Sequence, residues 1–141
     1  MKKKPRVPKY PADRNVLKRV MNRIQPFTEE EMTNLSLPLR MSYEAMRTGT
    51  ATEMDWSDMA AAINTCVLRT VGMPREVIEV SNAAVEALAK MYARFKKWGK
   101  FDPLAAELED LEAGLDLHEQ LCRLSTPVQM VKALRAVEGV T

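Results

Sequence analysis

Signals that start an α-helix recur along this chain, and each is followed by apolar residues spaced three or four apart. The two threonine signals have an acidic residue three positions later, which is the capping-box pattern at Thr28 and an N-cap signal at Thr52. The other three place a proline where the first turn of a helix tolerates one. No alternation of apolar and polar residues and no Asn-Gly hairpin turn predicts a strand. The five signals are Thr28, Thr52, Pro74, Asp102 with Pro103, and Pro127.

The fold class predicted from these signals is all-α, a compact helical bundle of five to six helices. Pro38 lies inside the first marked helix and is expected to bend or divide it. The longest predicted helix covers 75–98 and ends before Gly99. Leucines that recur from Leu104 to Leu124 predict the apolar face of the next helix. In the helix after Thr52, the apolar side is predicted to contain Met54, Met59, Ile63, Cys66, Val67 and Leu68.

Length and composition favour one ordinary domain inside the cell. The chain has 141 residues, of which 46% are hydrophobic and 28% charged, close to the averages for globular proteins. Its two cysteines have no Cys-x-x-Cys spacing, and no apolar run reaches the length that a bilayer requires. We therefore expect a cytoplasmic protein without membrane contact. The predicted division is a flexible arm over 1–12 and a single helical domain over 13–141.

Positive charge is concentrated at the start of the chain. Residues 1–23 hold nine basic side chains and one acidic one, a net charge of +8, whereas the remainder carries −6. Three prolines in the first dozen residues favour an extended conformation there. This arm could contact phosphates of a nucleic acid, serve as a solubilising tail, or fold onto the acidic body. The candidate binding residues are Lys2, Lys3, Lys4, Arg6, Lys9, Arg14, Arg19 and Arg23.

A second basic segment, Lys90–Lys100, interleaves lysines and arginine with aromatic residues. Its candidate binding residues are Arg94, Lys97 and Trp98. Such a mixture can contact phosphates and stack on bases. It is equally typical of a helix C-terminus, where lysines favour the helix dipole and aromatic rings cover the edge of the core. Both interpretations remain open from the sequence.

His118 and Cys122 lie four residues apart, so both would project from one face of a helix. The pair supplies two metal ligands where zinc sites use three or four, so it is only a weak metal or nucleophile candidate. The alternative is a packed histidine that bonds to Glu119 or Asp116 beside a buried thiol. The acidic residues of the same helix predict a solvated face in preference to an acid/base pair. The sequence predicts no catalytic residue, no metal and no cofactor.

The order of short motifs resembles small helical accessory proteins of proteobacterial phages, prophages and plasmids. The resemblance is carried by Lys4-Pro5-Arg6-Val7-Pro8, by Gly49-Thr50-Ala51-Thr52 with Asp55 and Asn64, and by Leu117-His118-Glu119-Gln120-Leu121 with Thr126. It spans nearly the whole chain. It implies an accessory protein of a mobile element, and it supplies no catalytic residue.

Three classes of function are therefore compared. The preferred one is a non-enzymatic accessory protein that binds a host or phage protein, which could include modulating or evading host defence. It would act as a homo-oligomer, with a dimer as the default. The alternative is a nucleic-acid or nucleotide-binding protein that uses the arm and Lys90–Lys100. An enzyme would require carboxylates from another helix to join His118 and Cys122.

Overall fold

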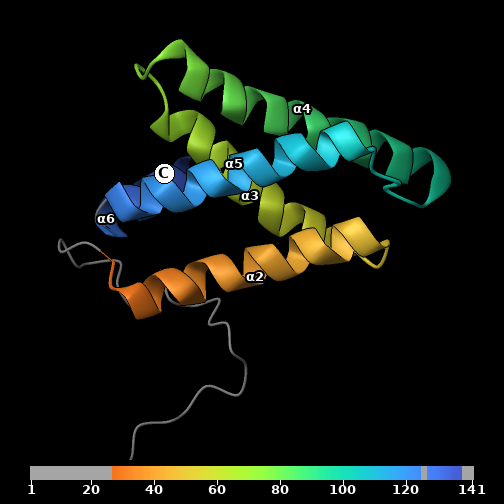
Figure 1. The fold of residues 1–141 in the computed structure, drawn as a ribbon, viewed down its shortest axis with the longest axis horizontal. Coiled ribbons are helices and arrows are strands. Elements are labelled where there is room, and N and C mark those ends of the chain that lie inside the picture. The colour runs from red at the N-terminus through yellow and green to blue at the C-terminus, as the bar shows by residue number, and fades with distance from the viewer. Residues whose placement is uncertain (1–26, 125–126, 138–141) are drawn as a thin grey trace, which may run out of the picture.

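The computed structural model describes residues 27–124 and 127–137, and all regular structure in these ranges is helical (Figure 1). The five helices are α2 (Glu29–Thr48), α3 (Glu53–Arg69), α4 (Arg75–Trp98), α5 (Ala105–Leu124) and α6 (Pro127–Val137). The prediction of an all-α bundle is confirmed. None of these five helices combines the length and the apolar character needed to cross a lipid bilayer. The arm over 1–12 and the first part of the predicted domain, 13–26, lie outside the described residues.

Local capping explains where α2 and α3 begin. The Thr28 hydroxyl accepts a hydrogen bond from the Glu31 N–H at 3.1 Å, and the Glu31 carboxylate accepts one from the Thr28 N–H at 2.9 Å. Thr52 and Asp55 form the same reciprocal box. Each box satisfies backbone donors that a helix N-terminus otherwise leaves unpaired. α2 continues through Pro38 as one helix, so the division considered from the sequence does not occur.

The start of α5 differs from its predicted position. Asp102 has a φ of 45° and does not cap the helix, which begins at Ala105. The Leu104 N–H instead donates to the Glu107 carboxylate at 3.0 Å. Glu107 thus reaches back over the first turn, as the acidic member of a capping box does. The helix begins two residues later than predicted because the Glu107 carboxylate, and not Asp102, accepts a hydrogen bond from a backbone N–H at the helix start.

α3 is the central helix of the bundle and packs against each of the other four. One core cluster joins α2, α3, α4, the connection to α5, and α5 itself. A smaller cluster at the beginning of the described chain contains Phe27, Met32 and Cys122. The main cluster consists of Met46, Met59, Ile63, Ala84, Ala87, Leu88, Met91, Phe101, Leu111 and Leu115.

Three helices meet most closely at Gly114. A Cβ atom at this position would lie 2.5 Å from the Ala84 Cβ and 2.8 Å from the Ile63 Cδ1. Atoms of real proteins do not approach so closely, so only glycine fits here without a shift. The absence of a side chain at Gly114 therefore allows α3, α4 and α5 to approach this closely.

Several residues that the sequence assigned to the core are exposed. They are Met54, Leu68, Leu104 and Leu124. Each lies in the first or last turn of its helix, or immediately before it, where neighbouring helices no longer cover the apolar side. The predicted periodicity is correct in the middle of the helices and fails at their ends.

Candidate functional site

The C-terminal end of α4, which carries the predicted segment Lys90–Lys100, packs against the connection to α5. The rings of Trp56 and Tyr92 lie 4.5 Å apart between centroids, and those of Phe95 and Phe101 lie 4.4 Å apart. The Trp56 Nε1–H donates to the Leu88 carbonyl at 2.9 Å. Most aromatic rings of the segment therefore form part of the core edge, as one of the two interpretations predicted.

Arg94 holds the α4–α5 connection in place. Its Nε–H donates to the Phe101 carbonyl at 2.9 Å, and its guanidinium forms an ion pair with Glu107. The Glu107 side chain is only 8% exposed. Burial alone would raise the pKa of Glu107, but hydrogen bonds from Arg94 and the Leu104 N–H, with the charges of Arg94 and Lys90, lower it overall. Arg94, a predicted binding residue, is therefore engaged inside the protein.

Lys97 and Trp98, the other two predicted residues of this segment, remain at the surface. The Trp98 side chain is 67% exposed, and the Lys97 Nζ lies 5.0 Å from its ring centroid. Lys96 and Lys100 are exposed beside them. A hollow of about 450 Å³ adjoins this group, and its lining includes Arg47, Phe95, Lys100 and Phe101. We call Lys96, Lys97, Trp98 and Lys100 the corner surface.

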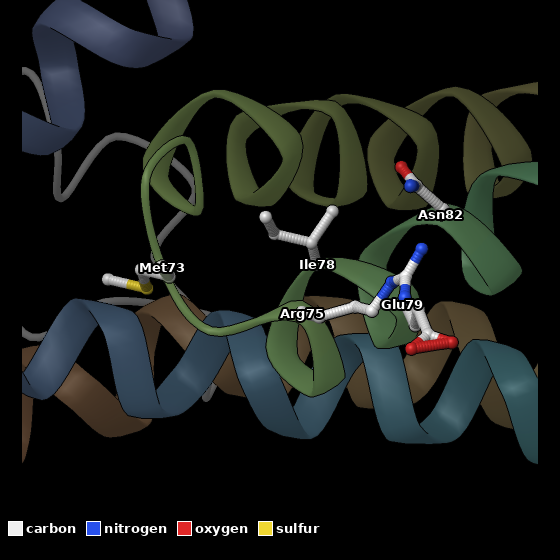
Figure 2. A pocket seen from close by; sticks show the side chains of 5 residues that line it. All are labelled: Met73, Arg75, Ile78, Glu79 and Asn82. Carbon is white, nitrogen blue, oxygen red and sulfur yellow. The ribbon is translucent and has the colours of Figure 1, made fainter.

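A second hollow, of about 600 Å³, lies at the start of α4 (Figure 2). It is lined by Met73, Arg75, Ile78, Glu79 and Asn82. The preceding chain presents two large apolar side chains to solvent, Val71 at 77% and Leu68 at 43% exposure. We call Leu68, Val71, Met73 and Ile78 the turn surface.

Sequence reasoning missed the turn surface. Leu68 was assigned to the core, and Val71 was not considered as a binding residue. The available signal was Gly72, which adopts a φ of 84° and separates Val71 from Met73. A left-handed glycine between two large apolar residues indicates a turn that leaves apolar side chains outside the helical core.

His118 and Cys122 come together as the sequence predicted, with 3.7 Å between Nε2 and Sγ. The buried Nδ1 of His118 has no hydrogen-bond partner in the described part of the chain. The expected bond to a neighbouring carboxylate is not formed, because Asp116 and Glu119 bind Arg40 of α2, at 2.5 Å and 3.5 Å. Burial, and then the charge of Arg40, lower the pKa of His118 to about 4.

Both thiols are buried, and burial raises the pKa of Cys66 and of Cys122 to about 12. A thiol with so high a pKa is protonated at neutral pH and is a poor nucleophile or metal ligand. Among residues 27–124 and 127–137, no three His, Cys, Asp or Glu side chains are grouped so that they could hold a metal ion. This part of the molecule thus favours the packed-histidine interpretation of His118 and Cys122.

The basic residues predicted in the arm lie outside the described residues, namely Lys2, Lys3, Lys4, Arg6, Lys9, Arg14, Arg19 and Arg23. The described chain begins at Phe27, which packs with Cys122 in the last turn of α5. Lys90–Lys100 lies near the first turn of α5, which is about 30 Å long at 1.5 Å per residue. The described chain therefore begins at the end of the bundle opposite to the corner surface.

No protein-family model, no curated protein and no solved structure matches this chain. The surfaces described above are thus the basis for a functional proposal.

Proposed function

We propose that this protein is a non-enzymatic accessory protein of a phage or another mobile element, which acts in the cytoplasm by binding a host or phage protein. The resemblance carried by Lys4-Pro5-Arg6-Val7-Pro8 and Leu117-His118-Glu119-Gln120-Leu121 supports the mobile-element origin. Modulation or evasion of a host defence system would be one use of such binding. The proposal includes self-association, with a dimer as the default.

The observation that carries this proposal is the turn surface. Val71 and Leu68 expose large apolar side chains next in sequence to a hollow that Met73 and Ile78 line. Arg75, Glu79 and Asn82 add polar groups to the same hollow. Exposed apolar side chains close to polar groups are typical of protein interfaces, and methionine adapts readily to a partner's shape. The turn surface therefore fits a protein partner better than a phosphate or a metal.

Affinity capture from proteobacterial cells, with nuclease treatment and mass spectrometry, tests the proposal. The wild-type chain is expected to retain a protein after nuclease treatment, and Leu68→Asp with Val71→Asp to lose it. A matched control is Met41→Asp with Leu104→Asp, because these side chains are also large, apolar and exposed, but lie elsewhere. Equal capture by the turn-surface variant and the wild type would contradict the proposal.

The second candidate function is nucleic-acid or nucleotide binding, and the corner surface favours it. Lys96, Lys97 and Lys100 are exposed and lie within two residues of the exposed Trp98 in sequence, so phosphate and base contacts are available on the same segment. Binding of this kind should weaken with salt, with a slope of log K against log salt of about −0.9 for each phosphate neutralised. Lys97→Glu with Trp98→Ala should reduce that slope, and deletion of residues 1–10 should reduce it further. Absence of binding at low salt would exclude this candidate.

A further inference from the structure

The outward face of α4 carries an ordered line of charged and small residues. Six residues follow one another at intervals of four, three, four, three and four, so they form one straight stripe along the helix. Five are exposed and Ala83 is half-buried. α4 lies at the edge of the bundle with α3 and α5 on one side of it (Figure 1). The α4 stripe consists of Glu79, Ala83, Glu86, Lys90, Ala93 and Lys97.

The charges of the α4 stripe are arranged symmetrically about Leu88. Glu86 and Lys90 lie two residues on either side of this position, and Glu79 and Lys97 lie nine residues on either side. The two alanines of the stripe lie five residues on either side. Every acidic residue therefore has a basic residue at the mirrored position, and every alanine has an alanine.

We propose that the α4 stripe is a dimerisation face that takes a second copy of this chain, with the two α4 helices antiparallel and crossing at the level of Leu88, whose own side chain is buried in the core on the opposite side of the helix. In this register Glu79 of one copy faces Lys97 of the other, and Glu86 faces Lys90, each pair occurring twice. A parallel arrangement would place like charges opposite each other, which opposes association. The pattern thus selects one orientation and one register.

Contacts within one copy are compatible with this register. Lys90 Nζ lies 3.1 Å from Glu86 Oε1 in the same helix, and both side chains are more than half exposed. At the two-fold axis, the two copies would combine these pairs into a cluster of four alternating charges. Ala83 and Ala93 leave room on each side of it for the helix backbones to approach, since close helix packing requires short side chains at the contact.

A second copy explains the pattern better than an unrelated partner does. A two-fold interface uses the same surface on both partners, so that surface must be complementary to itself. An unrelated partner would require only some charge pattern, without symmetry about one residue. The inference rests on the proposed function only for the expectation that the chain self-associates. The α4 stripe shares Glu79 with the hollow beside the turn surface, and it contains none of the four residues that define the turn surface.

Charge exchange tests the proposal. Glu79→Lys with Glu86→Lys makes all four charges of the stripe positive, and Lys90→Glu with Lys97→Glu makes all four negative. Each variant alone should self-associate at least about tenfold more weakly than the wild type in sedimentation, because like charges would face each other. An equimolar mixture should form a heterodimer. A monomeric wild type, variants that dimerise like the wild type, or a mixture that stays monomeric would overturn the proposal.

The register is tested by cross-linking with a short bifunctional maleimide. A mixture of Ala83→Cys and Ala93→Cys chains should cross-link, because these positions face each other across the dimer. Ala83→Cys alone is the control, since its two copies would lie ten residues, or about 15 Å, apart along the axis. The native thiols are buried and protonated and should not react. Equal cross-linking in the control and the mixture would overturn the antiparallel register. Capture of a partner by the Leu68 and Val71 variants is measured separately, so either proposal can fail alone.

Discussion

At the end of the bundle where α4 leads into α5, the buried Glu107 carboxylate is held by Arg94 and by the Leu104 N–H. Toward the other end of α5, the buried Nδ1 of His118 has no partner within the residues that the structure describes. A buried polar group that is bonded contributes to a rigid structure, whereas one without a partner lowers stability. We call these regions the anchored end and the open end.

The two ends also differ in how their large apolar side chains pack, although Trp98 is exposed at the anchored end as well. The anchored end places Tyr92, Phe95 and Phe101 in stacked contacts. The open end contains the α3–α4 turn, which leaves Val71 and Leu68 in solvent. The contacts that hold the anchored end together and the turn surface, which we propose binds a partner, therefore lie in different parts of the molecule. Changes at the anchored end should alter folding, and changes at the turn surface should alter partner binding with little effect on folding.

The largest effect is expected from Arg94→Ala at the anchored end. Removal of the guanidinium leaves the Glu107 carboxylate buried without its partner, which costs about 4 kcal/mol of unfolding free energy in comparable buried pairs. Urea denaturation would measure the loss as a lower midpoint. The control is Lys96→Ala on the same turn of α4, where the side chain is exposed and little change is expected. Equal midpoints for the two variants would contradict the anchoring role.

The next largest effect is acid destabilisation of the open end through His118. Its pKa is lowered from 6.5 to about 4 in the folded protein, so the unfolded chain binds a proton first as the pH falls. Stability is fully present above pH 6.5 and should decrease by about 3 kcal/mol as the pH falls to 4. His118→Leu should remove this decrease. Thermal melts of both proteins between pH 7 and pH 4 measure it.

Glu107 provides the contrast at lower pH. Its folded-state pKa is lowered below 4.5, so its contribution is present above that value and is lost only as the pH falls further. Acid should therefore weaken the open end before the anchored end. Hydrogen exchange in which the amides of the α4–α5 connection open before those around His118 at pH 5 would contradict this order.

A smaller effect is expected from Gly114→Ala, midway between the two ends. The added methyl would collide with Ala84 and Ile63, and overpacking of this kind costs roughly 1–3 kcal/mol. The higher helix propensity of alanine offsets about 1 kcal/mol of that cost. Ala84→Gly costs about 1 kcal/mol of helix propensity by itself, but it removes the nearest methyl, so the double variant should lose less stability than the two single variants together. Calorimetry on the single and double variants checks this, and a melting temperature that rises in the Gly114→Ala variant would refute the close approach.

The smallest effect on folding is expected from Val71→Asp at the turn surface. The side chain is largely exposed, so the free energy of unfolding should change by no more than about 0.5 kcal/mol. Partner capture should fall despite the unchanged stability. A large loss of stability would show that the turn surface belongs to the folded core and would remove the contrast between the ends.

Local signals made most of the fold predictable from the sequence. Thr28, Thr52 and Pro74 mark helix starts because capping and proline geometry act within one turn. Gly49 and Gly99 mark helix ends for the same reason, and both adopt the left-handed conformation.

The candidate sites were harder to predict because they depend on contacts between distant residues. In the sequence, Glu107 cannot be distinguished from the solvated acidic residues of its helix, because its partner Arg94 lies thirteen residues away. For the same reason, the sequence predicts Arg94 to be an exposed binding residue of the segment Lys90–Lys100. The sequence predicts that Asp116 or Glu119 bonds to His118, but Arg40 of another helix forms ion pairs with both carboxylates. Periodicity shows which side of a helix is apolar, and it does not show where neighbouring helices stop covering that side.

Alkylation of the two buried thiols can be used to measure local unfolding of the bundle. Cys66 lies on the central helix α3, and Cys122 lies near the end of α5. Neither sulfur can be alkylated while the helices cover it. The rate of alkylation at each position therefore measures how often that part of the bundle opens. If the end of α5 frays independently, Cys122 is modified well before Cys66. If the bundle opens only as a whole, both thiols are modified at one rate, and the chain behaves as a single cooperative unit.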